Sequence, residues 1–125
     1  MRLSYLAEYL RGTISTESFL VEISTELSDF SSGLHERGRS CPVVLSEDID
    51  MAVSSNEVLS LCSKVIDGSL NSVQLDYIIT ALELSDRVEF ASDEIREYIF
   101  EMGAPEINGV FTQQRAAEIS RALIV

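Results

Sequence analysis

The apolar residues of this chain recur mostly every three or four positions, which is the spacing of one face of an α-helix. No segment makes a convincing β-strand. Gly, Ser, Thr and Asn stand at the ends of the periodic segments, where they can stop one helix and cap the next. The predicted helices cover about residues 2–11, 16–31, 47–53, 56–67, 72–84 and 93–102. Ser92 should cap the helix over 93–102, and Thr112 should cap a last helix after it.

The turn between the first two helices carries the clearest local signals. Gly12 can take the left-handed conformation that follows a helix end, and Ser15 is a typical N-cap. Ile14 and Phe19 occupy the two positions of a hydrophobic staple. The segment 68–75 repeats this order, so we expect two helix hairpins with the same turn chemistry. Duplication of one unit would explain the repeat, although two turns that meet the same requirements independently are the simpler interpretation.

Residues 72–84 and 31–46 indicate how the helices are arranged. Residues 72–84 are apolar on more than one side, which predicts a central helix. Residues 31–46 contain two glycines, a proline and several serines without a period, so this segment should be the longest loop, and Ser46 should cap the helix after it. We therefore predict an all-α fold, a compact bundle of five to seven helices built from antiparallel helix hairpins, as a single domain over residues 1–125.

Composition adds a strong negative charge to this picture. Nine Lys and Arg stand against 21 Asp and Glu, for a net charge of −12, although 46% of the residues are hydrophobic. Such a chain should fold and not remain a disordered polyelectrolyte. It has no apolar run of the ~20 residues that a membrane span needs, and we expect no signal peptide in its first residues, which lack an apolar stretch and a cleavage site. Cys41 and Cys62 have no CxxC or histidine companion, which predicts free thiols in a reducing compartment, so we expect a cytoplasmic protein.

Half of the negative surplus lies between residues 83 and 106, where eight acidic residues accompany only two arginines. Glu94, Glu97 and Glu101 fall on one stripe of the predicted helix, where they repel one another. A merely solvated face would usually include lysines, so we favour recognition of a basic partner over plain solvation. Tyr98 lies beside the stripe, and aromatic residues next to acids are common in binding hot spots. The candidate partner-binding residues are Glu83, Asp86, Glu89, Asp93, Glu94, Glu97, Tyr98 and Glu101.

Catalytic and metal-binding chemistry has little support in the sequence. Glu47, Asp48 and Asp50 lack the residue order of a calcium loop, so we interpret them as charges in the first turn of a helix. His35 is the only histidine, and no nucleophile lies beside it in sequence. There is no phosphate-binding loop and no basic patch, and the negative charge opposes direct binding to nucleic acid. We expect a protein that is not an enzyme and that has no metal or cofactor.

Two parts of the chain carry a resemblance to a known family. They are Tyr9-Leu10-Arg11-Gly12-Thr13-Ile14-Ser15 leading to Phe19, and Ala81-Leu82-Glu83-Leu84-Ser85-Asp86 running through Asp93-Glu94-Ile95 and Phe100 to Pro105-Glu106-Ile107-Asn108-Gly109 and Thr112. On these residues the chain resembles the helical immunity proteins that bacteria make against their own polymorphic toxins, including those of contact-dependent growth inhibition and colicin systems. The resemblance covers most of the chain apart from residues 31–46. It implies a small cytoplasmic antitoxin of bacterial competition that binds one cognate toxin domain, often a nuclease, and blocks its active site or substrate surface.

Three hypotheses about function remain open from the sequence. An immunity protein would be a monomer that forms a one-to-one complex with a basic nuclease domain, and charge complementarity would speed that association. An acidic chaperone or adaptor for a secreted effector would more typically be a dimer that holds an unfolded segment in an apolar groove. A nucleic-acid-mimicking inhibitor would bind several unrelated basic proteins. We favour the first.

Overall fold

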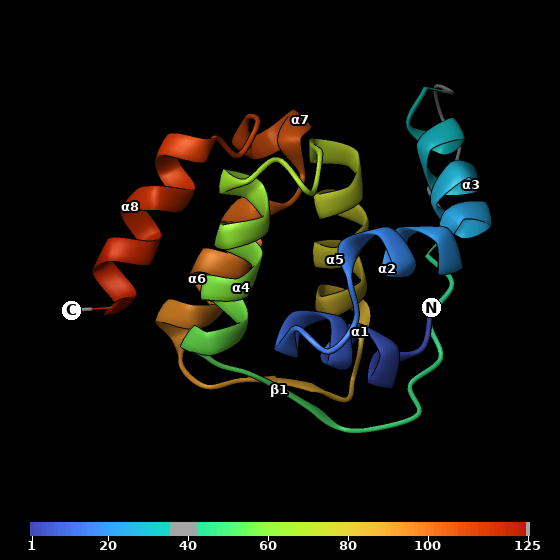
Figure 1. Cartoon of the computed structure of the whole chain (residues 1–125), viewed down its shortest axis with the longest axis horizontal. Helices are drawn as coiled ribbons and strands as arrows, with labels where there is room; N and C mark the ends of the chain where they lie inside the picture. Colours follow the sequence, from blue (N-terminus) through green and yellow to red (C-terminus); the bar gives the residue numbers. More distant parts are fainter. Residues whose placement is uncertain (36–42, 125) are drawn as a thin grey trace.

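The computed structural model describes residues 1–35 and 43–124, and it confirms the predicted all-α fold (Figure 1). Within these residues there are seven helices of seven or more residues, one four-residue helical turn and two short strands. In chain order the elements are α1 (Leu3–Arg11), α2 (Thr16–Glu22), α3 (Ser24–His35), β1 (Met51–Val53), α4 (Ser55–Ile66), α5 (Ser72–Leu84), β2 (Val88–Phe90), α6 (Asp93–Met102), α7 (Pro105–Asn108) and α8 (Gln113–Ile124).

The helix boundaries follow the local signals in the sequence. Gly12 ends α1 with a φ of 87°, in the left-handed region that glycine enters at little cost. The Ser15 hydroxyl accepts a hydrogen bond from the Ser18 backbone nitrogen at 3.1 Å and so caps α2. Ser92 caps α6 and Thr112 caps α8 in the same manner, through bonds of 3.2 Å and 3.0 Å. These caps were predicted correctly because each depends on residues only two or three positions apart.

Two predictions about the first half of the chain were wrong. The helix expected over residues 16–31 is two helices, α2 and α3, which meet at the buried Ile23. The bend lets α2 pack on α1 while α3 packs on α5, which one straight helix could not do. Because α3 continues to His35, it also takes up the first residues of the segment expected as a loop.

The helix expected over residues 47–53, with Ser46 as its cap, is also absent from the described structure. Its last three residues form β1, which pairs in parallel with β2, so the expectation of a strand-free chain was wrong as well. Ser46 exchanges backbone hydrogen bonds with Met1 and Leu3 instead, both at 2.9 Å. Met51 and Val53 are buried and Ala52 is exposed, the alternation of a half-buried strand, but a run this short shows no readable period in the sequence.

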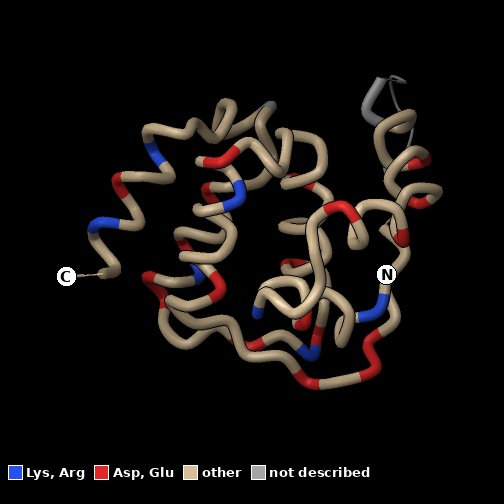
Figure 2. The backbone as a smooth tube through the Cα atoms, viewed as in Figure 1, with Lys and Arg blue, Asp and Glu red and all other residues tan. Residues whose placement is uncertain are grey.

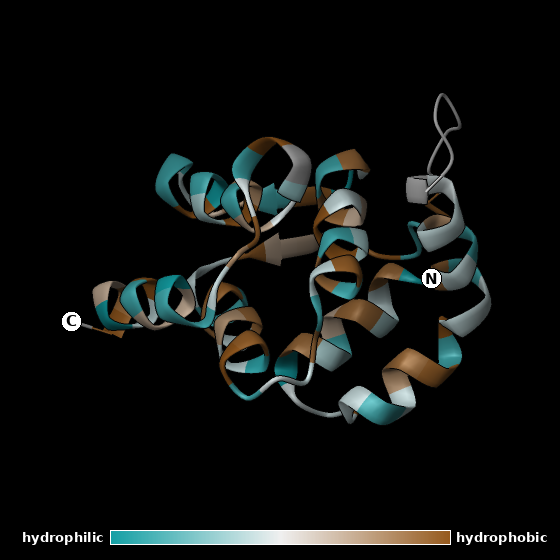
Figure 3. Cartoon of the chain, turned by 90° about the horizontal axis from the view of Figure 1, so that it is seen from above, coloured by the Kyte–Doolittle hydropathy of each residue, from teal (hydrophilic) through white to brown (hydrophobic). Residues whose placement is uncertain are grey.

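The helices α4 and α6 run in one direction and α5 and α8 in the other (Figure 1). The contacts of α5 with α6 and of α4 with α8 are therefore antiparallel, as predicted. The strands lie beneath the helices at the lower edge of Figure 1, and α1, α4 and α6 contact them. When the molecule is seen from above, α8 and α3 lie at opposite ends (Figure 3).

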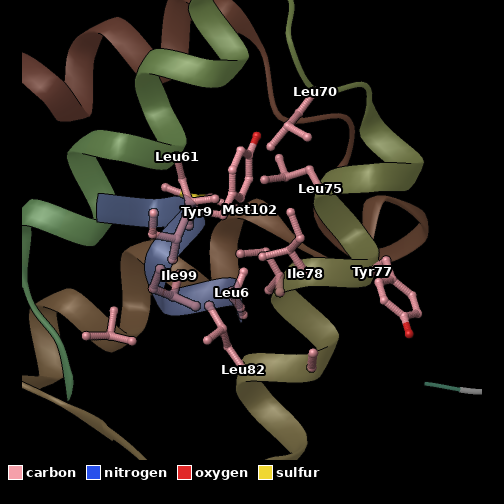
Figure 4. Close-up of a cluster of buried hydrophobic side chains, with 14 of the residues drawn as sticks. Leu6, Tyr9, Leu61, Leu70, Leu75, Tyr77, Ile78, Leu82, Ile99 and Met102 are labelled. Atoms are coloured by element: carbon pink, nitrogen blue, oxygen red, sulfur yellow. The ribbon is translucent and has the colours of Figure 1, made fainter. Parts of the chain in front are cut away.

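One hydrophobic core lies between α1, α4, α5 and α6 (Figure 4). Leu6 and Tyr9 of α1 meet Leu61 of α4 and Ile99 of α6 in this core, and all four are almost fully buried. Tyr77 lies on the other side of α5 and packs edge-to-face on Phe30 of α3, with 5.1 Å between ring centroids. Since α5 buries side chains on both sides, the prediction of a central helix is confirmed. None of the described helices has the length and apolar composition needed to cross a lipid bilayer.

Candidate functional site

The candidate residues lie along one continuous stretch of structure. Glu83 is near the end of α5, Asp86 is in the turn that follows, and Glu89 is the middle residue of β2. The remaining five are on α6: Asp93, Glu94, Glu97, Tyr98 and Glu101. Figure 2 shows acidic positions along the two strands and at the helix ends beside them. The sequence could not reveal that a strand connects the two groups of acids.

Glu101 differs from the other acids of α6 because it already has a cationic partner. Arg115 of α8 binds it with two parallel hydrogen bonds, Nε to Oε2 at 2.5 Å and Nη2 to Oε1 at 2.9 Å. Both side chains are about 40% exposed or less. The predicted stripe of three unneutralised glutamates is therefore a pair, Glu94 and Glu97, followed by an ion pair.

Tyr98 lies between these charges on α6. Its hydroxyl donates a hydrogen bond to Glu94 Oε1 at 3.2 Å. Burial, and secondly this bond to a carboxylate, raise the pKa of Tyr98 above its ordinary value, so the phenol stays protonated and keeps its donor. The nearby Arg96 places its guanidinium 4.9 Å from the ring centroid of Phe100, which is the geometry of a cation–π contact.

Arg87, which directly precedes β2, is likewise engaged within the chain. Arg87 Nε donates to Asp50 Oδ1 at 2.8 Å, and its Nη1 donates to the carbonyl oxygen of Glu47 at 2.9 Å. A pocket of about 310 Å³ lies at this end of the strands, lined by Asp50, Met51, Ala52, Asp86, Arg87 and Glu89. The two arginines of the acidic segment are thus held by groups of their own chain, and the segment's charge toward solvent stays negative.

Glu47 and Asp48 hold backbone and hydroxyl groups and are not the helix charges that the sequence suggested. Glu47 accepts from the Ser85 hydroxyl at 2.5 Å and from the Asp86 backbone nitrogen at 2.9 Å. Asp48 accepts from both the hydroxyl and the backbone nitrogen of Ser4. These hydrogen bonds to the charged form are the main reason that the pKa values of both carboxyls lie below their ordinary values. Sequence reasoning missed this role because the donors are about 40 residues away.

Metal binding and thiol chemistry gain no geometric support. Across residues 1–35 and 43–124, no group of three or more His, Cys, Asp or Glu side chains is placed to hold a metal ion. Cys62 is a buried free thiol, and burial raises its pKa. Cys41 lies outside the described residues, and His35 ends α3 with a side chain that is not described.

Two buried polar groups that the sequence did not single out join α5 to its neighbours. Asp76 of α5 is 5% exposed, and its Oδ1 accepts from the Ala104 backbone nitrogen at 3.0 Å, which joins α5 to the end of α6. The Tyr77 hydroxyl donates to Glu26 Oε1 at 2.7 Å and accepts from the Val44 backbone nitrogen at 3.2 Å. Both were hidden in the sequence because they lie within the apolar pattern of the central helix.

The fold and this site together define a small α-helical protein with an acidic surface. We define the acidic surface by six exposed residues on the end of α5, in the turn after it, on β2 and on α6: Glu83, Asp86, Glu89, Asp93, Glu94 and Glu97. Comparison with known protein families, with curated proteins and with solved structures gave no match. The resemblance to immunity proteins therefore stays a prediction.

Proposed function

We propose that this protein is an immunity protein that binds a cognate toxin domain, a basic nuclease, through the acidic surface. The observation that carries the proposal is that none of the six carboxylates forms an ion pair with any described residue. Of the two cations within the segment, Arg87 pairs with Asp50, which lies outside the six, and Arg96 lies over Phe100 without an ion pair to a described carboxylate.

The energetic argument is one of unbalanced charge. Crowded carboxylates repel one another, and a surface selected only for solubility relieves that repulsion with interspersed lysines. A nuclease presents a cationic cleft for phosphate, and an acidic surface complements such a cleft. Long-range attraction of this kind raises association rates toward ~10⁸ M⁻¹s⁻¹ at low salt, which suits an inhibitor that must bind before the toxin meets its substrate.

Affinity would depend on a few groups that lose water on binding, and Tyr98 is the best placed of them. It is half-buried, already held by Glu94, and adjacent to the exposed Glu97. An aromatic ring fixed in this way loses little conformational freedom when a partner covers it.

The test uses the product of the neighbouring open reading frame. Its C-terminal domain is co-expressed with this protein, and light scattering measures the mass of the complex. Stopped-flow mixing then measures the association rate at several salt concentrations. We expect a one-to-one complex, and the double change Glu94→Lys and Glu97→Lys should slow association at least about tenfold at low salt.

The matched control is the double change Glu8→Lys and Glu17→Lys on α1 and α2. Both residues are exposed, and the change in net charge is identical. Because electrostatic steering depends on where charge lies as well as how much there is, this control should slow association less. Equal slowing by the two pairs would show that only net charge matters and would remove the acidic surface from the interface.

One observation favours a second candidate function, an acidic chaperone or adaptor. A largely apolar groove of about 420 Å³ lies between α2, α3 and the start of α5, lined by Leu20, Ser24, Leu27, Ser28, Ser31, Asn71, Val73 and Gln74. Such a groove could hold an extended segment of an effector. Two measurements separate the functions: light scattering gives the oligomeric state, and a titration with an extended apolar peptide gives its affinity. A monomer that does not bind the peptide would contradict the chaperone.

A further inference from the structure

Strand β2 has one edge that pairs with β1 and one that faces away from it. The register places Met51, Ala52 and Val53 beside Val88, Glu89 and Phe90 in a parallel pair. The flanking hydrogen bonds run from the Met51 nitrogen to the Arg87 oxygen and from the Ala91 nitrogen to the Val53 oxygen, both at 2.9 Å. In a parallel ladder, alternate residues turn their backbone groups toward the partner strand. The backbone N–H and C=O groups of Arg87, Glu89 and Ala91 therefore face β1.

The backbone groups of Val88 and Phe90 consequently point to the outer edge. Within the part of the chain that the structure describes, no hydrogen bond uses the N–H or the C=O of either residue. The sheet has only these two strands, so no third strand of the described chain completes it. Such an edge presents donors and acceptors that an extended chain can pair with.

The charge around this edge restricts what can pair with it. Glu89 is exposed in the middle of β2, Asp86 precedes the strand, and Asp93 and Glu94 follow it. A second copy of this chain would bring another charge of −12 against them and be repelled. Natural edge strands commonly avoid self-pairing in this manner, by placing like charges on the edge.

We propose that the outer edge of β2 accepts an extended, basic segment of the partner as an added strand. The inference rests on the proposed function, since the segment belongs to the same cationic domain that the acidic surface would bind. Backbone hydrogen bonds to Val88 and Phe90 fix the position of the segment, and lysines or arginines at alternate positions lie on the side of Glu89. The parallel pair turns Val88 and Phe90 inward, where they are half-buried, so the opposite side of the added strand covers the rim of the helical layer.

The probe is a capped seven-residue peptide with the sequence Lys-Val-Lys-Val-Lys-Val-Lys, added to the full chain at low salt. Hydrogen exchange of individual amides is followed by NMR. We expect the Val88 and Phe90 amides to exchange rapidly in the free protein and at least about tenfold more slowly with peptide. The outward amide of Ala52, on the opposite edge of the sheet, should be unaffected. Absence of slowing at Val88 and Phe90 at saturating peptide overturns the proposal.

Two matched controls separate strand pairing from charge attraction. Val88→Pro removes an outward N–H from β2, whereas Ala52→Pro removes one from the outer edge of β1, and only the first should abolish binding. A peptide of the same sequence with alternate backbone nitrogens methylated keeps every charge but cannot pair, so it should bind far more weakly to the unaltered protein. This second control keeps the proposal testable should either proline variant fail to fold.

These experiments also distinguish a failure of strand addition from a failure of the proposed function. Equal binding of the methylated and unmethylated peptides overturns strand addition but leaves the acidic surface as a docking face. If charge reversal at Glu94 and Glu97 also leaves association with the toxin domain unchanged, the proposed function fails with it.

Discussion

Gly103 fixes how closely α6 approaches α5, and a single added methyl group tests that packing. Gly103 is buried directly after α6, and a Cβ atom placed on it would lie 2.7 Å from Ile79 Cγ2 and 3.2 Å from Ile79 Cβ. Ile79 is fully buried on α5 and branched at Cβ, so the contacted atoms lie close to its backbone and have little room to move. The change Gly103→Ala should therefore strain the contact that positions α6 and its acids.

The magnitude follows from the overlap. Carbon atoms in contact are normally about 3.5–4.0 Å apart, so the new methyl would overlap by about 0.8 Å or more. Overpacking of this kind costs about 1–3 kcal/mol. Alanine can adopt the φ of −102° found at Gly103. Because alanine has less conformational freedom than glycine in the unfolded chain, the change also stabilises the folded state by about 0.4–1 kcal/mol. We expect a net loss of about 1–2 kcal/mol in the free energy of unfolding, by combining these two ranges.

The assay is urea denaturation followed by far-UV circular dichroism, arranged as a double-mutant cycle. Ile79→Ala removes the methyl that would collide, so the two changes together should cost at least about 1 kcal/mol less than their sum. Gly12→Ala is the control: φ there is 87° and nothing lies within 4 Å of the added atom, so its cost comes from the backbone alone and Ile79→Ala should not relieve it. A Gly103→Ala protein as stable as the parent, or a cycle without coupling, would refute the packing argument.

Two further predictions concern hydrogen bonds that join distant segments. Tyr77→Phe keeps the ring but removes the donor to Glu26 at 2.7 Å, so urea denaturation should show a loss of about 1.5–3 kcal/mol, and a loss under about 0.5 kcal/mol would contradict the role of this bond. Glu47→Gln should flatten the dependence of the melting temperature on pH between about pH 5 and 3, because the bond from Ser85 lowers the pKa of Glu47 in the folded state. The stabilisation by the Glu47 carboxylate is present above its ordinary pKa of 4.5 and is lost as the pH falls through the lower pKa of the folded state. The same dependence of melting temperature on pH in parent and variant would exclude it.

Most predictions that depended on neighbouring residues in the chain were accurate, although the Ser46 cap and the helix over residues 47–53 were not, because strand pairing with β2 took precedence there. The caps at Ser15, Ser92 and Thr112 and the glycine stop at Gly12 are chemistry between residues a few positions apart, which any fold containing those helices would use. The central place of α5 was also readable, because a helix that is apolar on several sides can only be stable with neighbours on several sides.

The acidic site was predictable in its composition but not in its arrangement. Charge counting found the carboxylates, and six of them face solvent without an ion pair among the described residues. It could not reveal that Glu101 is held by Arg115, which comes from another helix 14 residues further along the chain. Nor could it show that Glu89 lies on a strand, since three residues are too few to establish a period.

The sequence by itself determined most of the helices, several of their ends and the excess of negative charge, because these depend on local chemistry and on composition. Only the tertiary structure decided which elements became neighbours. Met51 and Val88 pair across 37 positions of the chain, and Glu47 meets Ser85 across 38. Such contacts exist because the packed helices bring distant segments to one edge of the molecule. Local sequence patterns do not predict contacts between residues this far apart.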